Sequence, residues 1–378
     1  MIINPTYVDP KTGELFPLET PLWQSPDGNP LMISDLPGIS KDDIDFSERS
    51  IWRYRKALPI EIANPITMGE GLTPLLSRDL AGTEVHYKVE WLSPTGSFKD
   101  RGASVMLSYL RQVGVHAVLE DSSGNGGSAI AAYGAAGGIA VRILTPETTQ
   151  SAKVAQMRAF GAEVQLVPGP RENSQTEAIR QSNDTFYASH NWQAFFLQGT
   201  KLLAYELWED FGFTAPDNVI VPSSAGSNIL GLHIGFSELL RAGQIDRLPR
   251  LFCAQPENCA PVDAALRADA ADQVSFNSEP TIAEGTAIKE PVRMVQMLEA
   301  LRSSQGGAIT ASEAEIEQSV RDLASMGLYA EPTSAYGAVT TQKLLETGVI
   351  KPDEKTVIVL TGSGLKASAY MTDLFFDN

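Results

Sequence analysis

The chain has 378 residues, a hydrophobic content of 43% and a formal net charge of -17 at pH 7. This length allows two domains, since folded domains usually hold about 100 to 200 residues each. The acidic balance argues against nucleic acids and anionic membrane surfaces as partners, because both would repel the protein. We therefore expect a small-molecule ligand.

The amino-terminal residues 1–62 are rich in Pro, Gly and Asp and carry short apolar patches. They predict small strands and turns followed by one helix around residues 50–58, which together form a small N-terminal appendage. The first residues lack the basic region and apolar run of a secretory signal, and no window of about 20 apolar residues could span a bilayer. We expect a cytoplasmic protein.

From about Thr67 onward, β-branched runs alternate with helical apolar spacing. The runs predict strands at 116–120, 140–145, 163–167, 218–222, 250–255 and 356–361. The helical spacing predicts helices at 126–136, 151–160, 174–182, 197–211 and 228–242. Residues 304–327 add a short strand and a helix capped by Ser312 or Thr310. Such alternation predicts an α/β fold in which parallel twisted sheets are flanked by helices.

The chain contains two cysteines, Cys253 and Cys259. This number excludes a disulfide framework, and their spacing is not the paired spacing of a zinc site. We expect both to be buried as small apolar residues, and we predict no metal site.

Four junctions between a predicted strand or loop and a helix are loaded with small polar residues. Open parallel sheets bind ligands at this edge, because helix amino termini present unpaired N–H groups and partial positive charge. The junctions are SFKDRG at 97–102, DSSGNGGS at 121–128, PSSAGSN at 222–228 and TGSGLK at 361–366. Any one of them could be an ordinary turn or helix cap, but four together predict a binding site.

The residue types at these junctions suggest pyridoxal phosphate. The backbone N–H groups of 223–228 can converge on a phosphate, although the GxxxxGK[ST] spacing of a P-loop is absent. Lys99 forms a Schiff base if its pKa is lowered, although a lysine at a helix start is by itself more often a solvated cation. Asn125 offers a donor and an acceptor, and Thr361 offers a hydroxyl at a strand end.

Five ordered motifs then connect the chain to a known family. They are GEGLTPL at 69–75, SPTGSFKDRG at 93–102, SSGN at 122–125, EPTSA at 331–335 and TGSGLK at 361–366. In order and spacing the chain resembles threonine synthase and its relatives in the tryptophan-synthase-β-like group of pyridoxal-phosphate enzymes, known as fold type II. The resemblance covers most of residues 65–370. It implies pyridoxal 5'-phosphate as cofactor, a small amino-acid substrate and a homodimer.

The resemblance also implies a domain organisation with the cofactor in an interdomain cleft. Residues 63–96 plus 191–378 would form a large cofactor-binding domain, and residues 97–190 would form a small inserted α/β domain. Within the appendage at 1–62, residues 1–45 resemble the small knuckle that precedes some family members, without the cysteines that would hold a metal there.

The roles of individual residues follow from the same resemblance. Lys99 would hold the cofactor as a Schiff base and then move the Cα proton, and Asn125 would bond to the cofactor's 3'-oxygen. Thr361 would face the pyridine nitrogen, where a hydroxyl favours elimination and replacement over transamination. The phosphate loop would comprise Ser224, Ala225, Gly226, Ser227 and Asn228. The substrate's α-carboxylate would meet Ser122, Ser123 and Gly124, with Gly126 beside them.

Two positions depart from the pattern of threonine synthases. Gly126 stands where these enzymes usually have a reactive threonine, and Phe196 stands where an arginine helps to hold the phosphate of O-phosphohomoserine. A phenylalanine cannot bind a dianion. His190 and Trp192 either pack in the core or line the substrate pocket, and the sequence leaves both roles open. Lys201 is either a substrate-anion contact or an exposed lysine in the first turn of a helix.

Three functions therefore stand beside one another. The first is a threonine-synthase-like lyase that acts by Cα deprotonation and β- or γ-elimination or replacement. The second is a β-replacing or β-eliminating enzyme acting on a non-phosphorylated amino acid, such as a dehydratase, an ammonia-lyase or a cysteate- or cysteine-synthase-like enzyme. Gly126 and Phe196 favour this second function. The third, a catalytically silent binding protein, predicts loss of the imine-forming lysine, whereas Lys99 is present.

Overall fold

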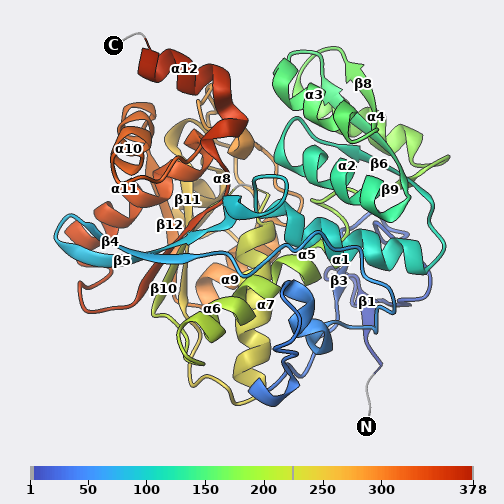
Figure 1. Ribbon diagram of the computed structural model, residues 1–378, viewed down its shortest axis with the longest axis horizontal. Coiled ribbons are helices and arrows are strands. Elements are labelled where there is room, and N and C mark those ends of the chain that lie inside the picture. Colours follow the sequence, from blue (N-terminus) through green and yellow to red (C-terminus); the bar gives the residue numbers. More distant parts are fainter. Residues whose placement is uncertain (1–3, 224, 377–378) are drawn as a thin grey trace. The chain divides into compact units, whose positions relative to one another are not determined.

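A computed structural model describes residues 4–223 and 225–376. Contacts between Cα atoms divide the chain into two compact units, one of residues 1–71 and 99–202 and one of residues 72–98 and 203–378 (Figure 1). No helix within the described ranges is long and apolar enough to cross a membrane. The boundaries predicted from the sequence, which separate an appendage and an insert from a large domain, stay a prediction.

The first unit is built on a parallel sheet of four strands in the order β8-β7-β6-β9. The strands are β6 (Ala117–Asp121), β7 (Ala140–Pro146), β8 (Glu163–Val167) and β9 (Phe186–Tyr187). Its helices are α1 (Lys99–Gln112), α2 (Asn125–Gly137), α3 (Ser151–Ala159), α4 (Arg171–Gln181) and α5 (Ala194–Thr200). Strands and helices alternate, as the sequence predicts.

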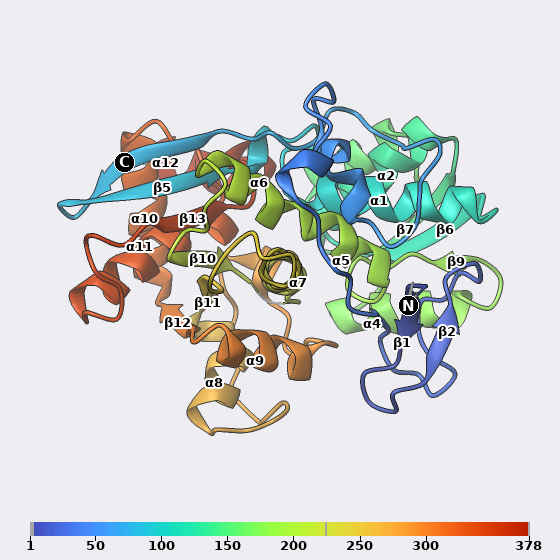
Figure 2. The same cartoon turned by 90° about the horizontal axis from the view of Figure 1, so that it is seen from below.

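The amino-terminal segment packs within this first unit. It forms an antiparallel sheet of order β2-β1-β3, from β1 (Thr6–Val8), β2 (Leu15–Pro17) and β3 (Met32–Ile33), and the short 3-10 helices η1 (Lys41–Asp43) and η2 (Ile51–Ala57). The Tyr7 hydroxyl donates to the Tyr109 hydroxyl of α1 at 2.8 Å, and the Trp23 ring lies edge-on to Tyr187 at 5.0 Å. Figure 2 shows β1 and β2 side by side, as their antiparallel pairing requires. The segment is thus part of the core of its unit.

The second unit is built on a sheet of six strands in the order β12-β11-β10-β13-β5-β4. All pairs are parallel except β4 with β5. The strands are β4 (Leu75–Leu80), β5 (Thr83–Val89), β10 (Asn218–Pro222), β11 (Arg250–Pro256), β12 (Gly307–Ala311) and β13 (Thr356–Leu360). Its helices are α6 (Leu202–Asp210), α7 (Ser227–Arg241), α8 (Pro261–Arg267), α9 (Met294–Ser303), α10 (Glu313–Ser325), α11 (Pro332–Glu346) and α12 (Ser368–Phe376). Four 3-10 helices complete it, η3 (Glu90–Leu92), η4 (Glu257–Cys259), η5 (Glu284–Thr286) and η6 (Gly364–Ala367).

The predicted α/β class with parallel sheets is confirmed, and so are the six predicted strands of the longer runs. Ser312 caps α10 in a capping box with Glu315, and both cysteines are buried. One helix prediction is wrong. Residues 197–211 form two helices, α5 and α6, rather than one, with a one-residue break at Lys201, whose backbone dihedrals stay in the right-handed helical region.

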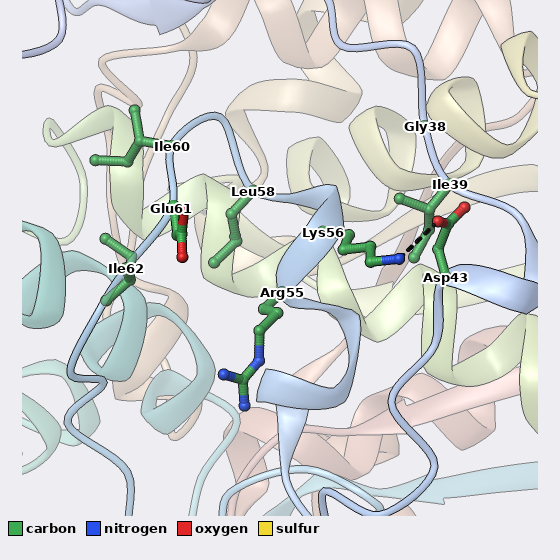
Figure 3. Close-up of a pocket in the computed structure, with 9 residues that line it drawn as sticks. All are labelled: Gly38, Ile39, Asp43, Arg55, Lys56, Leu58, Ile60, Glu61 and Ile62. Atoms are coloured by element: carbon green, nitrogen blue, oxygen red, sulfur yellow. Dashed lines mark hydrogen bonds and ion pairs between the residues drawn. The ribbon is translucent and has the colours of Figure 1, made fainter.

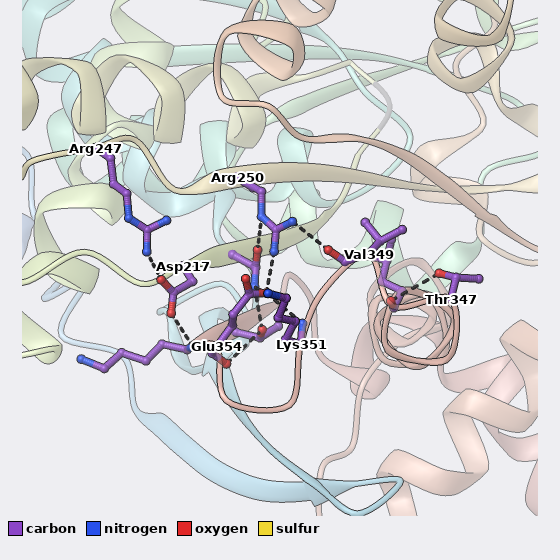
Figure 4. Close-up of polar contacts among 11 residues, drawn as sticks. Asp217, Arg247, Arg250, Thr347, Val349, Lys351 and Glu354 are labelled. Carbon is purple, nitrogen blue, oxygen red and sulfur yellow. Dashed lines mark hydrogen bonds and ion pairs between the residues drawn. The ribbon is translucent and has the colours of Figure 1, made fainter.

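Polar side chains fix the amino ends of three parallel strands in the second unit (Figure 4). Arg250, at the start of β11, donates to Asn218 Oδ1 of β10 at 2.8 Å and to Glu354 Oε2 at 2.5 Å. Asp217 accepts from the backbone N–H of Lys355, just before β13, at 2.7 Å. Ligands of parallel sheets bind at the opposite, carboxyl edge. This network therefore sets strand register and leaves the carboxyl edge for chemistry.

A buried ion pair ties the β4–β5 hairpin to α6. The Lys88 ammonium lies 2.6 Å from Glu206 Oε1 and 2.6 Å from Asp210 Oδ2. Glu206 also accepts from the backbone N–H groups of Leu72 and Thr73, at 2.9 Å each. Because these donors satisfy both carboxylate oxygens of Glu206, its negative charge is tolerated in the interior. This carboxylate therefore holds the backbone of the GEGLTPL motif in place at Leu72 and Thr73.

Candidate active site

Lys99 is the first residue of α1, as predicted from the loop-to-helix junction. Part of its surface is accessible, yet protein atoms surround the ammonium, and this desolvation lowers its pKa from 10.5 to about 7. The carboxyl of Glu120 opposes that shift and the charge of Arg171 adds to it. The ammonium also lies 5.6 Å from the centroid of the Phe196 ring. A lysine with such a pKa is partly neutral at pH 7 and can act as a nucleophile or a base.

Phe196 is an apolar wall next to this amine. It is fully buried in α5, and a Cβ built on Gly102 would come within 2.5 Å of its ring. Glycine at position 102 is therefore needed for α1 to approach the ring this closely.

The SSGN loop lies at the carboxyl end of β6 in the same unit. The Ser122 N–H donates to the Leu144 carbonyl at 3.1 Å, and Ser122 Oγ accepts from the Gly124 N–H at 3.4 Å. Asn125 is the first residue of α2, and Gly124, its N-cap, provides no side-chain cap. Ser123 is half-buried between them. The unit thus brings Lys99 together with the 122–126 loop at one end of its sheet.

Two buried acids precede this loop. Glu120 lies at 2.5 Å from Nδ1 of His190 and accepts from its backbone N–H at 3.0 Å. The Tyr187 hydroxyl donates to Asp121, which also accepts from Ser189 Oγ at 3.3 Å. Burial raises the pKa of Glu120 well above its usual range, and the neighbouring Asp121 adds to the rise. Burial also raises the pKa of Asp121.

The second unit holds the predicted phosphate loop after β10. Ala225 is half-buried, and Gly226, with φ of 88°, precedes the first turn of α7 without a side-chain cap. A Cβ on Gly226 would lie 2.3 Å from the Met297 sulfur, so the loop packs too closely for another residue. Ser227 and Asn228 begin the helix and are buried. Ser224 lies outside the described residues.

Thr361 follows β13 in the second unit and is 3% exposed. Its carbonyl accepts from the Phe98 N–H at 3.1 Å, and Gly362 bridges Ser97 in an antiparallel pair. The segment that leads into Lys99 is therefore bonded to the end of the last strand. Phe98 is the last residue of this stretch of the second unit, and Lys99 begins the next stretch of the first.

These residues fit pyridoxal phosphate on three observations. The uncapped first turn of α7 leaves N–H groups for an anion, and the close approach at Gly226 requires a glycine. Neither atom of the buried Asn228 amide has a hydrogen-bond partner in the described ranges 4–223 and 225–376. Such orphaned groups call for a ligand. The lowered pKa of Lys99 suits an amine that reacts with an aldehyde.

One further candidate residue and one further cavity lie apart from these site residues. Lys201 is fully buried and donates to the Ala57 carbonyl at 2.7 Å, so the alternative of an exposed lysine is wrong. The alternative of a substrate-anion contact stays a prediction. A separate cavity of about 630 Å³ is lined by Gly38, Ile39, Asp43, Arg55, Lys56, Leu58, Ile60, Glu61 and Ile62 (Figure 3). Lys56 and Asp43 pair across it at 3.0 Å. It contains none of the predicted site residues.

Comparison with known proteins identifies the class. Residues 66–362 match the model of the family described as "Pyridoxal-phosphate dependent enzyme". The chain is 34% identical to threonine synthase of Methanocaldococcus jannaschii, over 87% of this chain and 83% of that one. It is 32% identical to threonine synthase of Halalkalibacterium halodurans, over 84% and 90% of the two chains.

Solved structures agree on the fold. The processed form of threonine deaminase isoform 2 from Solanum lycopersicum gives a TM-score of 0.70 at 21% identity, covering 90% of each chain. An L-serine ammonia-lyase from Rhizomucor miehei gives 0.70 at 21% identity, covering 80% of this chain and 97% of that one. Fold and sequence together define a fold type II enzyme.

The chain belongs to the family of pyridoxal-phosphate-dependent enzymes. Within it, the chain is a threonine-synthase-like lyase that acts on an amino acid and uses pyridoxal 5'-phosphate as cofactor. The resemblance stated from the five motifs is confirmed. The roles of the individual site residues stay predictions.

Sequence reasoning missed the buried acids of the first unit. Glu120 and Asp121 end β6 and engage His190 and Tyr187, and the half-buried Arg171 exerts its charge on Lys99 as well as on both acids. Two adjacent acids at the end of an apolar run were the available signal, because buried carboxylates require donors. His190 is buried, and its two alternative roles, core packing and a place in the substrate pocket, both stay predictions.

Proposed function

We propose that this enzyme catalyses β-elimination or β-replacement on an amino acid whose side chain carries no phosphate. The observation that carries the proposal is the fully buried Phe196 ring, 5.6 Å from the Lys99 ammonium. An apolar ring offers no hydrogen-bond donor to a phosphate dianion. A small hydroxylated, acylated or sulfur-bearing side chain is compatible with such a wall.

The proposed roles of the residues follow the family pattern. Bound pyridoxal phosphate supplies an electron sink for negative charge at the substrate's Cα. Lys99 would hold the cofactor and move the Cα proton, Asn125 would bond to the cofactor's 3'-oxygen and Thr361 would face its ring nitrogen. The phosphate would be held by N–H groups and side chains of 224–228, and the substrate carboxylate by residues 122–124 beside Gly126.

Lys99 has the protonation behaviour that this chemistry needs. With a pKa of about 7, roughly half of the amine is neutral at pH 7 and can accept a proton. A lysine at its ordinary pKa of 10.5 would be neutral in less than about one molecule in a thousand. The desolvated position at the start of α1 therefore supplies the base.

The test is a substrate screen on the holoenzyme. L-serine, L-threonine, O-acetyl-L-serine and O-phosphohomoserine are offered, while keto-acid release, replacement by added thiol, phosphate release and threonine formation are followed. We expect keto acid or a thiol adduct from a β-substituted amino acid, and no phosphate release. Threonine and phosphate formed from O-phosphohomoserine at an ordinary enzymatic rate would overturn the proposal. A matched variant, Phe196→Leu, should keep the same preference, because it keeps the wall apolar.

We further propose that the enzyme is a homodimer and cytoplasmic, as the family resemblance implies. Light scattering on the purified holoenzyme tests the first point, with a mass of twice 40.7 kDa expected. A monomer at micromolar concentration would contradict it. Fractionation of the cells that make the protein tests the second point, with the protein expected in the cytoplasmic fraction.

A further inference from the structure

A buried histidine–glutamate pair stands in the first unit next to the candidate active site. His190 is 5% exposed and Glu120 is fully buried. Glu120 holds both the ring and the backbone of His190, because its Oε1 lies 2.5 Å from Nδ1 and its Oε2 accepts from the backbone N–H at 3.0 Å. The second ring nitrogen, Nε2, has no hydrogen-bond partner among residues 4–223 and 225–376. The ring is thus oriented from one side and available on the other.

The imidazole occupies the space above Gly126. A Cβ built at position 126 would lie 2.7 Å from His190 Cε1 and 2.8 Å from Nδ1. These distances are too short for any side chain at 126 to coexist with the ring where it stands. Glycine at 126 and histidine at 190 therefore form one arrangement, and this arrangement lies against the 122–126 loop.

The same ring also lies near the reactive amine. Its centroid is 5.7 Å from that of Phe196, whose centroid is 5.6 Å from the Lys99 ammonium. Burial lowers the pKa of His190 well below its usual range, and the charges of Lys99 and Arg171 lower it further. The other groups that face the pair are Asp121 and, through Asp121, Tyr187. Both shifts favour a neutral imidazole and a protonated Glu120 that donates to Nδ1 of His190.

Nε2 of His190 has no hydrogen-bond partner in the part of the chain that the structure describes, yet it does not belong to the fully buried polar atoms that lack one, so water or a ligand can reach it. Here one nitrogen is paired at 2.5 Å and the other is left for a ligand. Close to a lysine that takes a Cα proton, the ligand that fits is the side chain of the substrate.

We propose that His190 is a catalytic residue that donates a proton to the departing side-chain group of the substrate, and that Glu120 is its positioning residue. The proposal rests on the proposed β-elimination. In that step the Cα–H bond breaks and its proton goes to Lys99, while the Cβ–O bond breaks and the Cα=Cβ bond forms. Nε2–H of His190 protonates the departing oxygen, which leaves as water. The Glu120 proton moves to Nδ1, so the pair ends as neutral His190 with an ionised Glu120.

The test compares two leaving groups on the holoenzyme. Hydroxide from L-serine needs a proton to depart, whereas chloride from β-chloro-L-alanine does not. In His190→Asn we expect keto-acid release from serine to fall about 10²- to 10³-fold, the usual share of a general acid, with chloride release changed less than about threefold. Glu120→Gln should lower the serine rate alone about tenfold, because the amide keeps the ring in place but cannot yield its proton. His233→Asn, the same change at a half-buried histidine of α7, is the matched control.

Two further readouts separate a chemical role from a structural one. Exchange of the substrate's Cα proton with D₂O, followed by NMR, depends on Lys99 and should persist in His190→Asn. The melting temperature and the visible absorbance of the bound cofactor should also persist. If both leaving groups slow equally in His190→Asn, or if neither slows, the proposal is overturned.

Assays of the wild-type protein separate a failure of the role proposed for His190 from a failure of the proposed β-elimination. Chloride release with no keto acid from serine or another β-hydroxy amino acid would overturn the role of His190 while leaving β-elimination intact. Absence of both reactions and of Cα exchange would overturn the proposed function, and this inference with it. Keto acid from both substrates in the wild type, with the selective loss in His190→Asn, is the expected result.

Discussion

Replacing Gly126 with alanine is the sharpest test of how the first unit is packed. The new Cβ would meet His190 Cε1 at 2.7 Å, Nδ1 at 2.8 Å and Ser122 Oγ at 3.0 Å. Ordinary non-bonded contacts between carbons are about 3.5 to 4.0 Å, so the imidazole must move by roughly 1 Å. That movement must lengthen or bend the 2.5 Å contact between Nδ1 and Glu120. Overpacking of this kind costs about 1 to 3 kcal/mol of unfolding free energy.

The consequence for activity should exceed the consequence for stability. A displacement of about 1 Å in a positioned catalytic group can lower the rate about 10²-fold. A loss of about 2 kcal/mol would lower the melting temperature by only a few degrees in a chain of this size. We therefore expect Gly126→Ala to fold and bind cofactor, to retain Cα proton exchange, and to lose most of its elimination rate with serine.

The assay is a double-mutant cycle of Gly126→Ala with His190→Ala, read by urea unfolding and by melting temperature. Removing the imidazole opens the space for the new methyl group, so Gly126→Ala should cost at least about 1 kcal/mol less in the His190→Ala background. Gly307→Ala is the control, since a Cβ at position 307 has no atom within 4 Å. Equal costs of Gly126→Ala in both backgrounds would refute the reasoning, because the clash would then not involve His190.

Three other changes test the core and the base. In the protein without cofactor, the free energy of unfolding should rise with pH between about 7 and 10.5, because Lys99 is neutral when folded and protonated when unfolded in this window. The slope contributed by Lys99 reaches about 1.4 kcal/mol per pH unit, and Lys99→Met should remove it from urea titrations, whereas an unchanged slope would contradict a lowered pKa. Lys88→Met should cost about 3 to 5 kcal/mol in urea unfolding, because it leaves the buried Glu206 carboxylate without its cation; a cost under about 1 kcal/mol would contradict this. Tyr7→Phe should cost about 1 kcal/mol by the same measurement, since the Tyr109 hydroxyl keeps its bond to the Leu18 carbonyl, and a loss above about 3 kcal/mol would show a larger role for the N-terminal sheet.

The central strands were predictable because they are buried on both faces. The run NVIVP at 218–222 is buried at every position, and it forms β10 with the predicted bounds. A continuous apolar run of this length has few other places in an α/β fold. The polar junctions after these strands were predictable for the same reason, because the end of a buried strand is where the chain first meets solvent or ligand.

The β4–β5 hairpin escaped prediction for a local reason. Its two-residue turn, Ala81-Gly82, has positive φ at both positions, 52° and 82°. Such turns usually carry Asn-Gly or Asp-Gly, so alanine hides the signal. The close approach of α5 to α1 escaped prediction for a tertiary reason. A Cβ on Gly199 would lie 2.1 Å from the Arg101 carbonyl oxygen, a contact with α1 that no local pattern contains.

The pair of His190 with Glu120 depended on a strand too short to be seen. Phe186 and Tyr187 form β9, a strand of two residues, and they pair in parallel with Val118 and Leu119 of β6. This register carries the residues after β9 alongside the end of β6, where the two acids lie. The two adjacent acids by themselves indicate only that hydrogen-bond donors must lie nearby, because burying a carboxylate without donors destabilises the folded protein. The register of β9 decides which donors these are. The role that we propose for His190 therefore depends on the pairing of two residues, Phe186 and Tyr187, with β6, whereas the role of Lys99 was predicted from a contiguous motif.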